Sequence, residues 1–543
     1  MSAAGDGAAS AAGAAPARPA YFDTGWTGGR SPWVIALVVS MATFMEVLDT
    51  SIANVSLPHI AGDLSVTQDQ STWVLTSYLV SNAVVLPVSG WLATRIGRKR
   101  FYMICVALFA ASSFMCGIAP TLGTLVLFRV LQGIGGGGLA PSEQAILVDT
   151  FPPAKRGAGM AIYGMAVVVA PAIGPTLGGF ITEHLSWRWV FFINIPVGLL
   201  SLYLTSRVVT DPPHLKEMRQ RAGGIDYVGL GLISIGLGCL EYVLDKGQEE
   251  DWFNSPAIIG FAAASAACIV AFVIWESRQE HPIIDVRMFK SRTLASGGAL
   301  MLLIGILLYA PTVLLPAFEQ TLMGYTAEQA GQTMSPGGFA MILLMPLSGA
   351  LVARVDPRKL LAIGAALLAV SLFYLSERLS VGMDFRTAVL LRLFQTTGFA
   401  FLFVPINALV YAGVAPQKNN AVAGIMNLGR NVGGSIGIAV VTTIIARHAQ
   451  SHQADLTAHT NGYNPAFRAL LAGIQRGLER AGASTTEAAH RAIAIVYRQL
   501  QLQAAQLAYL DAFRTLAVAA VCMVPLVVLA RYAKPAGPPP AGH

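Results

Sequence analysis

Long apolar segments alternate with short polar connections along nearly the whole sequence, from about residue 33 to residue 532. A segment of about 20 apolar residues can cross the hydrocarbon core of a bilayer as a helix. The pattern therefore predicts an all-α integral membrane protein with fourteen transmembrane helices. We place these helices at residues 33–57, 72–94, 101–119, 121–148, 157–181, 187–208, 225–244, 256–275, 294–316, 332–353, 359–376, 386–413, 421–446 and 511–532.

The positions of Lys and Arg test this number of helices, because loops on the cytoplasmic side of a membrane are enriched in both. With a cytoplasmic N-terminus, the cytoplasmic segments hold 22 of these residues and the short outer loops hold four. One helix more or fewer would exchange the sides and scramble this division. The sequence therefore predicts a protein of the cytoplasmic (inner) membrane with a disordered tail at 1–32, a short tail at 533–543, and both tails in the cytoplasm.

Composition agrees with this picture and excludes several functions. Of the 543 residues, 54% are hydrophobic and 12% are charged, whereas soluble domains have about 25% charged residues. The net charge of +7 comes from the basic loops and does not indicate nucleic-acid binding. A GxGxxG match from Gly133 to Gly138 lies in a predicted membrane helix with no preceding strand, which excludes a dinucleotide site. Without an HExxH or GxxxxGK[ST] motif, we expect no enzyme, no cofactor and no ATP-driven pump.

The sequence repeats itself across its middle. The segment PVSGWLATRIGRKR (87–100) matches PLSGALVARVDPRK (346–359), and RVLQGIG (129–135) matches RLFQTTG (392–398). Both matches relate one predicted helix to the helix eight places further along. We therefore predict a six-helix bundle at 33–208, two inserted helices with their loops at 209–293, and a second six-helix bundle at 294–532.

One outer segment, residues 447–510, is much longer than the others. Its helical periodicity predicts an amphipathic helical excursion outside the membrane. The segment contains His448, His452 and His459, and the spacing of the first two would place both imidazoles on one side of a helix. No carboxylate or cysteine completes a convincing ligand set and the segment is polar, so we expect a solvated helix and no metal site.

Two carboxylates, Glu46 and Asp49, lie inside the first predicted helix, in MEVLDTSIANVSLP (45–58). A charged residue at the centre of a bilayer costs about 2.5–3.5 kcal/mol, so both need partners, a cavity or protons. At 100° per residue they share one side of the helix with Thr50. The opposite side, with Leu48 and Ile52, is expected to face lipid.

Depth in the membrane proposes a partner for Asp49. At 1.5 Å per residue, Asp49 and Arg129 both lie about 12 Å below the outer boundary, and Glu46 lies about 16 Å below it. Arg392 is the equivalent cation of the second half, but its first helix has no acid at matching depth, since Glu319 lies at the outer end. We predict that Asp49, Glu46 and Arg129 form a proton-coupling site; the alternative is a buried ion pair that only fixes packing.

Several motifs resemble those of the fourteen-helix drug:proton antiporters of the major facilitator superfamily, EmrB/QacA type. They are LDTSIANVSLPHIAGDL (48–64), TWVLTSYLVSNAVVLPVSGWLATRIGRKR (72–100), LFRVLQGIGGGG (127–138) and GPTLGGFI (174–181). The resemblance implies a major facilitator fold that exports hydrophobic drugs or other toxic small molecules in exchange for protons by alternating access. It also implies a possible periplasmic adaptor and an outer-membrane channel as partners.

The resemblance assigns further residues. It implies a gating loop between the second and third helices, where Thr94 replaces an Asp that is common in the superfamily. It also implies a glycine- and proline-containing antiporter helix, which argues against uptake. The gating residues would be Gly90, Arg95, Gly97, Arg98, Lys99 and Arg100, and those of the antiporter helix Gly164, Gly174, Pro175, Gly178 and Gly179.

The substrate is expected near the middle of the membrane, between the two halves. Alternatives to drug export are a dedicated exporter of a metabolite or siderophore, an uptake symporter and a non-transporting membrane protein. The candidates for the substrate cavity are Glu46, Thr50, Asn54, Gln132, Arg392, Gln395, Asn407 and Arg430.

Overall fold

The computed structural model describes residues 25–152, 155–213, 215, 226–280, 282–412, 414, 418–461 and 463–530. Within these residues the regular structure is helical, and fourteen helices are long and apolar enough to cross a membrane. The protein is thus a multi-pass membrane protein, and the predicted fold class is confirmed. Residues 1–24 and 531–543, which include most of both expected tails, lie outside the described residues.

The first half contains six spans, which pack on one another through α2 with α8 and α10, and through α6 with α4 and α5. The fourth and sixth spans are each divided into two helices. The elements are α2 (Pro32–Asp63), α3 (Gln68–Ser71), α4 (Trp73–Ile96), α5 (Arg98–Gly117), α6 (Leu122–Gly136), α7 (Leu139–Thr150), α8 (Arg156–His184), α9 (Trp189–Phe192) and α10 (Asn194–Val208).

The break between α6 and α7 falls in the glycine run at 133–138, and close helix packing explains the glycines. A Cβ atom on Gly135 would lie 2.7 Å from the backbone nitrogen of Phe109 on α5. One on Gly133 would lie 2.5 Å from the backbone oxygen of Tyr78 on α4. Only residues without a side chain permit this approach on both sides. The run is therefore a packing device inside a membrane span.

The inserted pair follows, with α12 (Tyr227–Lys246) and α13 (Pro256–Glu276) packed against each other. Two short turns, η2 (Trp252–Asn254) and η3 (Val286–Lys290), flank α13. Only α12 packs closely on both halves, through α4 and α18. The indole nitrogen of Trp252 donates a hydrogen bond of 3.0 Å to Thr443 on α18. The inserted pair thus lies beside one of the two seams between the halves.

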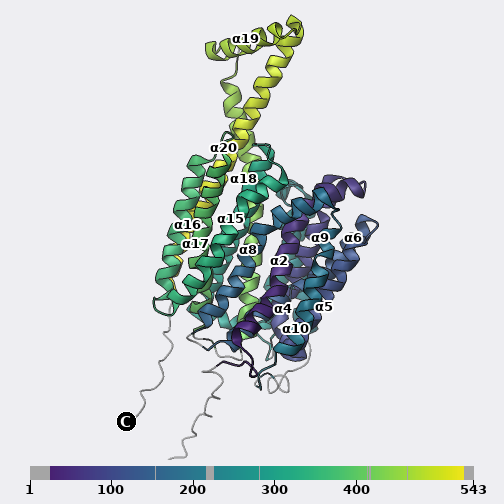
Figure 1. Ribbon diagram of the computed structural model, residues 1–543, viewed down its shortest axis with the longest axis vertical. Coiled ribbons are helices and arrows are strands. Elements are labelled where there is room, and N and C mark those ends of the chain that lie inside the picture. Colours follow the sequence, from purple (N-terminus) through teal and green to yellow (C-terminus); the bar gives the residue numbers. More distant parts are fainter. Residues whose placement is uncertain are drawn as a thin grey trace, which may run out of the picture.

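The second half again contains six spans, and two of them continue well beyond the membrane. Helices α18 and α20 have 40 and 45 residues, or about 60 and 68 Å at 1.5 Å per residue, twice the thickness of the hydrocarbon core. Their ends project with α19 as a helical extension (Figure 1). The elements are α14 (Arg292–Thr321), α15 (Ala327–Val352), α16 (Pro357–Arg378), α17 (Phe385–Tyr411), α18 (Asn419–Ala458), α19 (Pro465–Arg480) and α20 (Thr485–Leu529).

The helical extension marks the upper end of the molecule in Figure 1; at the lower end α2 begins and α20 finishes. The halves meet along two seams, α8 with α15 and α4 with α18. At the upper end, a Cβ atom on Gly331 would lie 2.3 Å from the backbone nitrogen of Thr176. At the lower end, one on Gly90 would lie 2.7 Å from the backbone oxygen of Asn420. The two halves therefore pack closely against each other at both ends of the molecule.

Candidate functional site

The predicted ion pair of the first half is present and completely buried. Arg129 Nη1 donates to Asp49 Oδ2 at 2.6 Å, and neither side chain is exposed. The other carboxylate oxygen, Oδ1, accepts hydrogen bonds from Gln132 Nε2 at 3.0 Å and from Asn194 Nδ2 at 2.6 Å. The acid of α2 therefore has three donors from α6 and α10, and both of its oxygens are occupied.

Arg129 is held by more than its acid. Its Nε donates to the backbone oxygen of Val74 at 2.9 Å, and its Nη1 also donates to Gln132 Oε1 at 2.8 Å. The guanidinium carbon lies 4.4 Å from the centre of the Tyr78 ring, where the negative face of the ring attracts a cation. Among the described residues its Nη2 has no partner. These contacts hold the cation in place in addition to the ion pair.

Glu46, one turn before Asp49 on α2, has only one oxygen in use. Its Oε1 accepts from Asn82 Nδ2 at 3.0 Å and from the Tyr78 hydroxyl at 3.3 Å. Within the described part of the chain, Oε2 is buried without a hydrogen-bond partner. Asn82 also accepts a 3.3 Å hydrogen bond from Asn431 of the second half. Glu46 is thereby connected to the seam between the halves.

A polar network crosses the middle of the molecule. The Tyr163 hydroxyl of α8 donates to Asn427 Oδ1 at 2.8 Å and accepts from Arg430 on α18. Asn427 donates in turn to Gln144 Oε1 at 2.8 Å, and Gln144 donates to Asn407 of α17 at 3.4 Å. Two predicted cavity residues, Asn407 and Arg430, therefore belong to one buried chain of hydrogen bonds between the halves.

At the lower end, one residue of the predicted gating loop forms a buried ion pair. Arg98 Nη1 lies 2.5 Å from Asp149 Oδ2, and the other oxygen of Asp149 accepts from Asn419 of the second half at 2.8 Å. Thr94, which stands where an Asp is common in the resembled superfamily, accepts from Asn420 at 3.2 Å. The lower end is thus joined across the seam by Asp149 and Thr94.

The other gating residues have separate contacts. The amine of Lys99 donates to the Ser206 backbone oxygen at 2.7 Å, and the Arg95 guanidinium lies 5.7 Å from the Trp91 ring. Gly97 has a φ of +103° at the turn between α4 and α5, which favours glycine. Arg100 is exposed.

The glycines of α8 pack against α2 and correct one prediction. A Cβ atom on Gly174 would lie 2.3 Å from Ser51 Oγ, and one on Gly178 would lie 3.0 Å from Ile52. Ile52 is fully buried and Leu48 is 8% exposed, so the expected lipid side of the first helix was wrong. The small residues of α8 let α2 approach on that side. The remaining residues predicted for the antiporter helix α8 are also buried, namely Gly164, Pro175 and Gly179.

The equivalent position of the second half is simpler. Arg392 is buried and donates to Gln395 Oε1 at 2.8 Å, but no acid lies within ion-pair distance of it among the described residues. Glu319 is buried at the upper part of α14 and accepts from the Thr333 hydroxyl at 2.7 Å. The second half therefore repeats the Arg–Gln pair without its acid.

Two predicted cavity residues do not join these networks. Asn54 is exposed, and the Thr50 hydroxyl donates back to the Val47 backbone oxygen at 2.9 Å.

Sequence reasoning also missed functional candidates. Asn194 and Asp149 bind the charged groups described above, and Glu143 of α7 is fully buried with one oxygen accepting from Ser40. The signal for Glu143 was available, because it is an acid inside a predicted membrane helix. Asn194 carries no such signal, since neutral amides are common in membrane helices.

Comparison with known proteins decides the family. Residues 39–438 match the Major Facilitator Superfamily. The chain belongs to this superfamily. Proteins of this superfamily are transporters. This protein is therefore a transporter rather than an enzyme.

Relatives that are similar over most of the chain are named for multidrug export or for fatty acid resistance. The chain is 36% identical over 442 residues to "Multidrug export protein EmrB" of Escherichia coli K12, covering 81% of this chain and 86% of that protein. It is 38% identical over 455 residues to "Fatty acid resistance protein FarB" of Neisseria gonorrhoeae, covering 83% and 88%. The predicted resemblance to EmrB-type transporters is confirmed.

Solved structures agree on the fold. The human organic anion transporter MFSD10 (TETRAN) superposes with a TM-score of 0.58 at 14% identity, over 92% of this chain and all of that chain. A double Trp mutant of XylE gives 0.58 at 15% identity, over 93% and 96%. At this identity the likeness concerns the architecture alone.

Proposed function

We propose that this superfamily transporter is a proton-driven antiporter that exports hydrophobic small molecules across the cytoplasmic membrane. Its lower end and both termini would face the cytoplasm. The names of the EmrB and FarB relatives support hydrophobic drugs or fatty acids as the substrate class. The observation that carries the proposal is the pair of buried acids on α2, Asp49 and Glu46, in a half that meets the other through glycine-rich seams.

The different hydrogen bonds of Asp49 and Glu46 suggest different roles in proton uptake. Three donors, one of them a cation, stabilise the ionised form of Asp49, so its protonation is disfavoured until a donor turns away. Glu46 Oε2 lacks a partner among the described residues, so a proton can bind there without breaking a hydrogen bond. In this mechanism Glu46 takes up the proton first, and Asp49 follows when the seam opens and Asn194 or Gln132 moves.

The substrate would act on Glu46 at the centre of the molecule. Arg430 is close enough to interact electrostatically with Glu46, and Asn431 reaches Asn82, a hydrogen-bond partner of Glu46. A substrate that separates these groups changes the charge balance around Glu46. Substrate and proton then compete through one network, which is the requirement of antiport.

Alternating access requires that the seams open one end at a time. The lower end is held by Asp149, which binds Arg98 in its own half and Asn419 in the other. The upper end is held by the 2.9 Å contact between the Thr176 and Ser335 hydroxyls. The contacts at each end are few and polar, so opening either end replaces a few hydrogen bonds within the protein by hydrogen bonds to water.

The helical extension suits a partner outside the membrane. Tyr463 is 94% exposed, and Leu470, Ile493 and Tyr497 are also exposed on the extension. Large apolar patches on a water-facing surface mark interaction sites. We assign this surface to a periplasmic adaptor that leads to an outer-membrane channel. Replacing residues 459–484 by a short Gly–Ser linker should then abolish resistance in cells and preserve transport in vesicles.

The first experiment measures dye efflux from pump-deficient cells and from proteoliposomes with an imposed proton gradient. Asp49→Asn is compared with Glu319→Gln, a buried acid of the other half. We expect wild type and Glu319→Gln to export, and Asp49→Asn to lose export, as wild type does when the gradient is collapsed. Normal export by folded Asp49→Asn, or export without a gradient, would contradict the proposal.

A further inference from the structure

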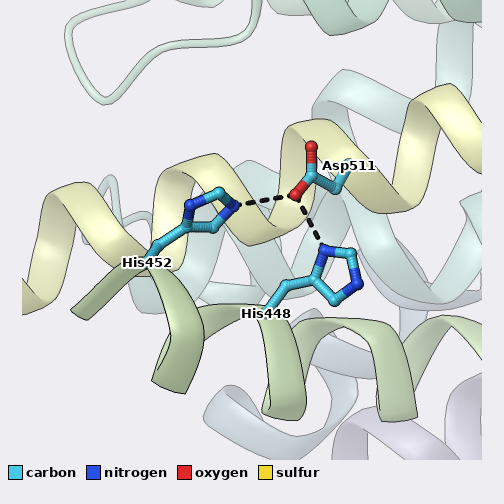
Figure 2. A group of neighbouring side chains, drawn as sticks. All are labelled: His448, His452 and Asp511. Carbon is cyan, nitrogen blue, oxygen red and sulfur yellow. Dashed lines mark hydrogen bonds and ion pairs between the residues drawn. The ribbon is translucent and has the colours of Figure 1, made fainter. Parts of the chain in front are cut away.

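Two imidazoles and a carboxylate meet where the helical extension leaves the second half. Nδ1 of His448 and Nε2 of His452 each lie 2.8 Å from the same oxygen, Oδ2 of Asp511. The three potential ligand atoms lie within 4.8 Å of one another. Figure 2 shows both rings, from α18, turned toward the Asp511 carboxylate on α20. The expectation that no carboxylate completes this histidine pair was wrong.

The cause of the error is distance along the chain. His448 and His452 are one helical turn apart and share a side of α18, which the sequence shows. Asp511 lies 63 residues after His448, at the start of the last predicted membrane helix (511–532). Only the antiparallel packing of α18 and α20 brings it into place. The third histidine, His459, instead directs its Nδ1 to the backbone oxygen of Asp455 at 3.0 Å.

The ligand types and their exposure suit a divalent transition metal. Two imidazoles and one carboxylate, with water in the fourth position, form a familiar open zinc set. The His448, His452 and Asp511 side chains are 48%, 28% and 26% exposed, so a metal can enter from water and retain a water ligand. All three lie on long helices, which hold their backbone positions.

The surrounding charges also permit a cation. Arg514 approaches the other oxygen of Asp511, with Nη1 4.0 Å from Oδ1. The same guanidinium is bound by Glu377, through a 3.0 Å contact from Nη2. The two carboxylates and one guanidinium leave a net charge of −1 beside the neutral imidazoles. Oδ2 is the oxygen of Asp511 that faces the two histidines (Figure 2).

We propose that His448, His452 and Asp511 bind a divalent transition metal ion, with Zn²⁺ as the type, and that this ion fastens α18 to α20 at the base of the helical extension. Each neutral ring would carry its N–H on the nitrogen that faces away from the metal. With metal–ligand bonds of about 2.0–2.2 Å, neighbouring tetrahedral ligand atoms are about 3.3 Å apart. The present 2.8 Å separations must therefore widen by about 0.5 Å, which small side-chain rotations provide.

The test is metal binding by the purified full chain in detergent, after removal of any histidine tag. Co²⁺ is titrated as a spectroscopic substitute for Zn²⁺, because four-coordinate Co²⁺ absorbs strongly in the visible range and hydrated Co²⁺ absorbs weakly. Zn²⁺ is then added in competition, and the thermal midpoint is measured with and without it. The variants are His448→Ala and Asp511→Asn, with His459→Ala and Asp455→Asn as controls on the same extension.

We expect one Co²⁺ per chain, displacement by Zn²⁺, and a rise in the thermal midpoint of wild type with Zn²⁺. Each triad variant should weaken binding at least about tenfold and lose the rise, and both controls should behave as wild type. Absence of the Co²⁺ spectrum, or an unchanged spectrum in His448→Ala, would overturn the proposal. Metal binding is measured without transport, so its outcome is independent of the proposed antiport.

Discussion

The two halves of this transporter carry the same Arg–Gln pair on equivalent spans but surround it differently. In the first half, Arg129 and Gln132 bind Asp49, and Asn194 completes the cluster. In the second half, Arg392 binds Gln395 and forms no ion pair among the described residues, while Glu319 interacts with it electrostatically from a longer distance. The duplicated architecture therefore does not imply duplicated chemistry. In the described residues, an acid pairs directly with this arginine in the first half alone.

The largest expected effect comes from removing each arginine. Arg129→Leu leaves Asp49 buried without its cation, and breaking a buried pair in this way costs about 3–5 kcal/mol. Arg392→Leu strands only the Gln395 amide oxygen, which costs about 1–2 kcal/mol. The free energies of unfolding in mixed detergent measure both. Equal costs would show that the two halves are alike after all.

Substitutions of Gln132 and Gln395 measure how much Asp49 contributes to the stability of the first half. A hydrogen bond to a charged group contributes about 1.5–3 kcal/mol. Gln132 makes two such bonds, to Arg129 and Asp49, whereas Gln395 makes one, to Arg392. Gln132→Leu should therefore destabilise the protein about twice as much as Gln395→Leu in the same unfolding assay. Gln132→Leu in an Asp49→Asn background should cost no more than Gln395→Leu.

Glu46→Gln tests the proton chemistry with little change in structure. A glutamine keeps an oxygen to accept from Asn82 and Tyr78, so the unfolding free energy should change by less than about 1 kcal/mol. In proteoliposomes, wild-type export should rise as the pH on the upper side falls. The variant should be insensitive to this pH and at least about tenfold slower, or about 1.4 kcal/mol in activation free energy. An unchanged pH dependence would remove Glu46 from the mechanism.

The smallest effect is expected from the acid of the second half. Glu319 has one oxygen bound by Thr333, and a glutamine can accept the same bond. Glu319→Gln should change the unfolding free energy by less than about 1 kcal/mol, and export should stay within about twofold of wild type. Thr333→Val is the matched control for the hydrogen bond alone. Loss of export in Glu319→Gln, with normal export in Thr333→Val, would place proton chemistry in both halves.

Much of the fold was predictable because membrane spans have a length set by the bilayer. Apolar length and the positions of Lys and Arg predict fourteen spans, and fourteen helices suited to a membrane are present. The division of the fourth and sixth spans was not predicted, because a short break inside an apolar run leaves hydropathy unchanged. The sequence also did not predict that α18 and α20 continue into the extension. Apolar content falls where a helix leaves the membrane, even when the helix itself continues into water.

The candidate site was predictable where charge and depth were sufficient. Asp49 and Arg129 were predicted at matching depth in one bundle, and they pair. The lipid side assigned to Ile52 was wrong, because apolar side chains suit both lipid and protein neighbours. The glycines of α8, which decide between the two, act on a helix more than 100 residues away, as the 120-residue separation between Ser51 and its α8 partner Pro171 illustrates.

The sequence by itself determined the number of spans and the pairing of Asp49 with Arg129, because both follow from hydrophobic length and helical rise. The tertiary structure alone decided which neutral and distant groups complete each cluster. Asn194 reaches Asp49 across 145 residues, and Asp511 reaches His448 across 63. Such contacts depend on the rotation and crossing of packed helices, and the helical period of one segment does not specify its orientation against another.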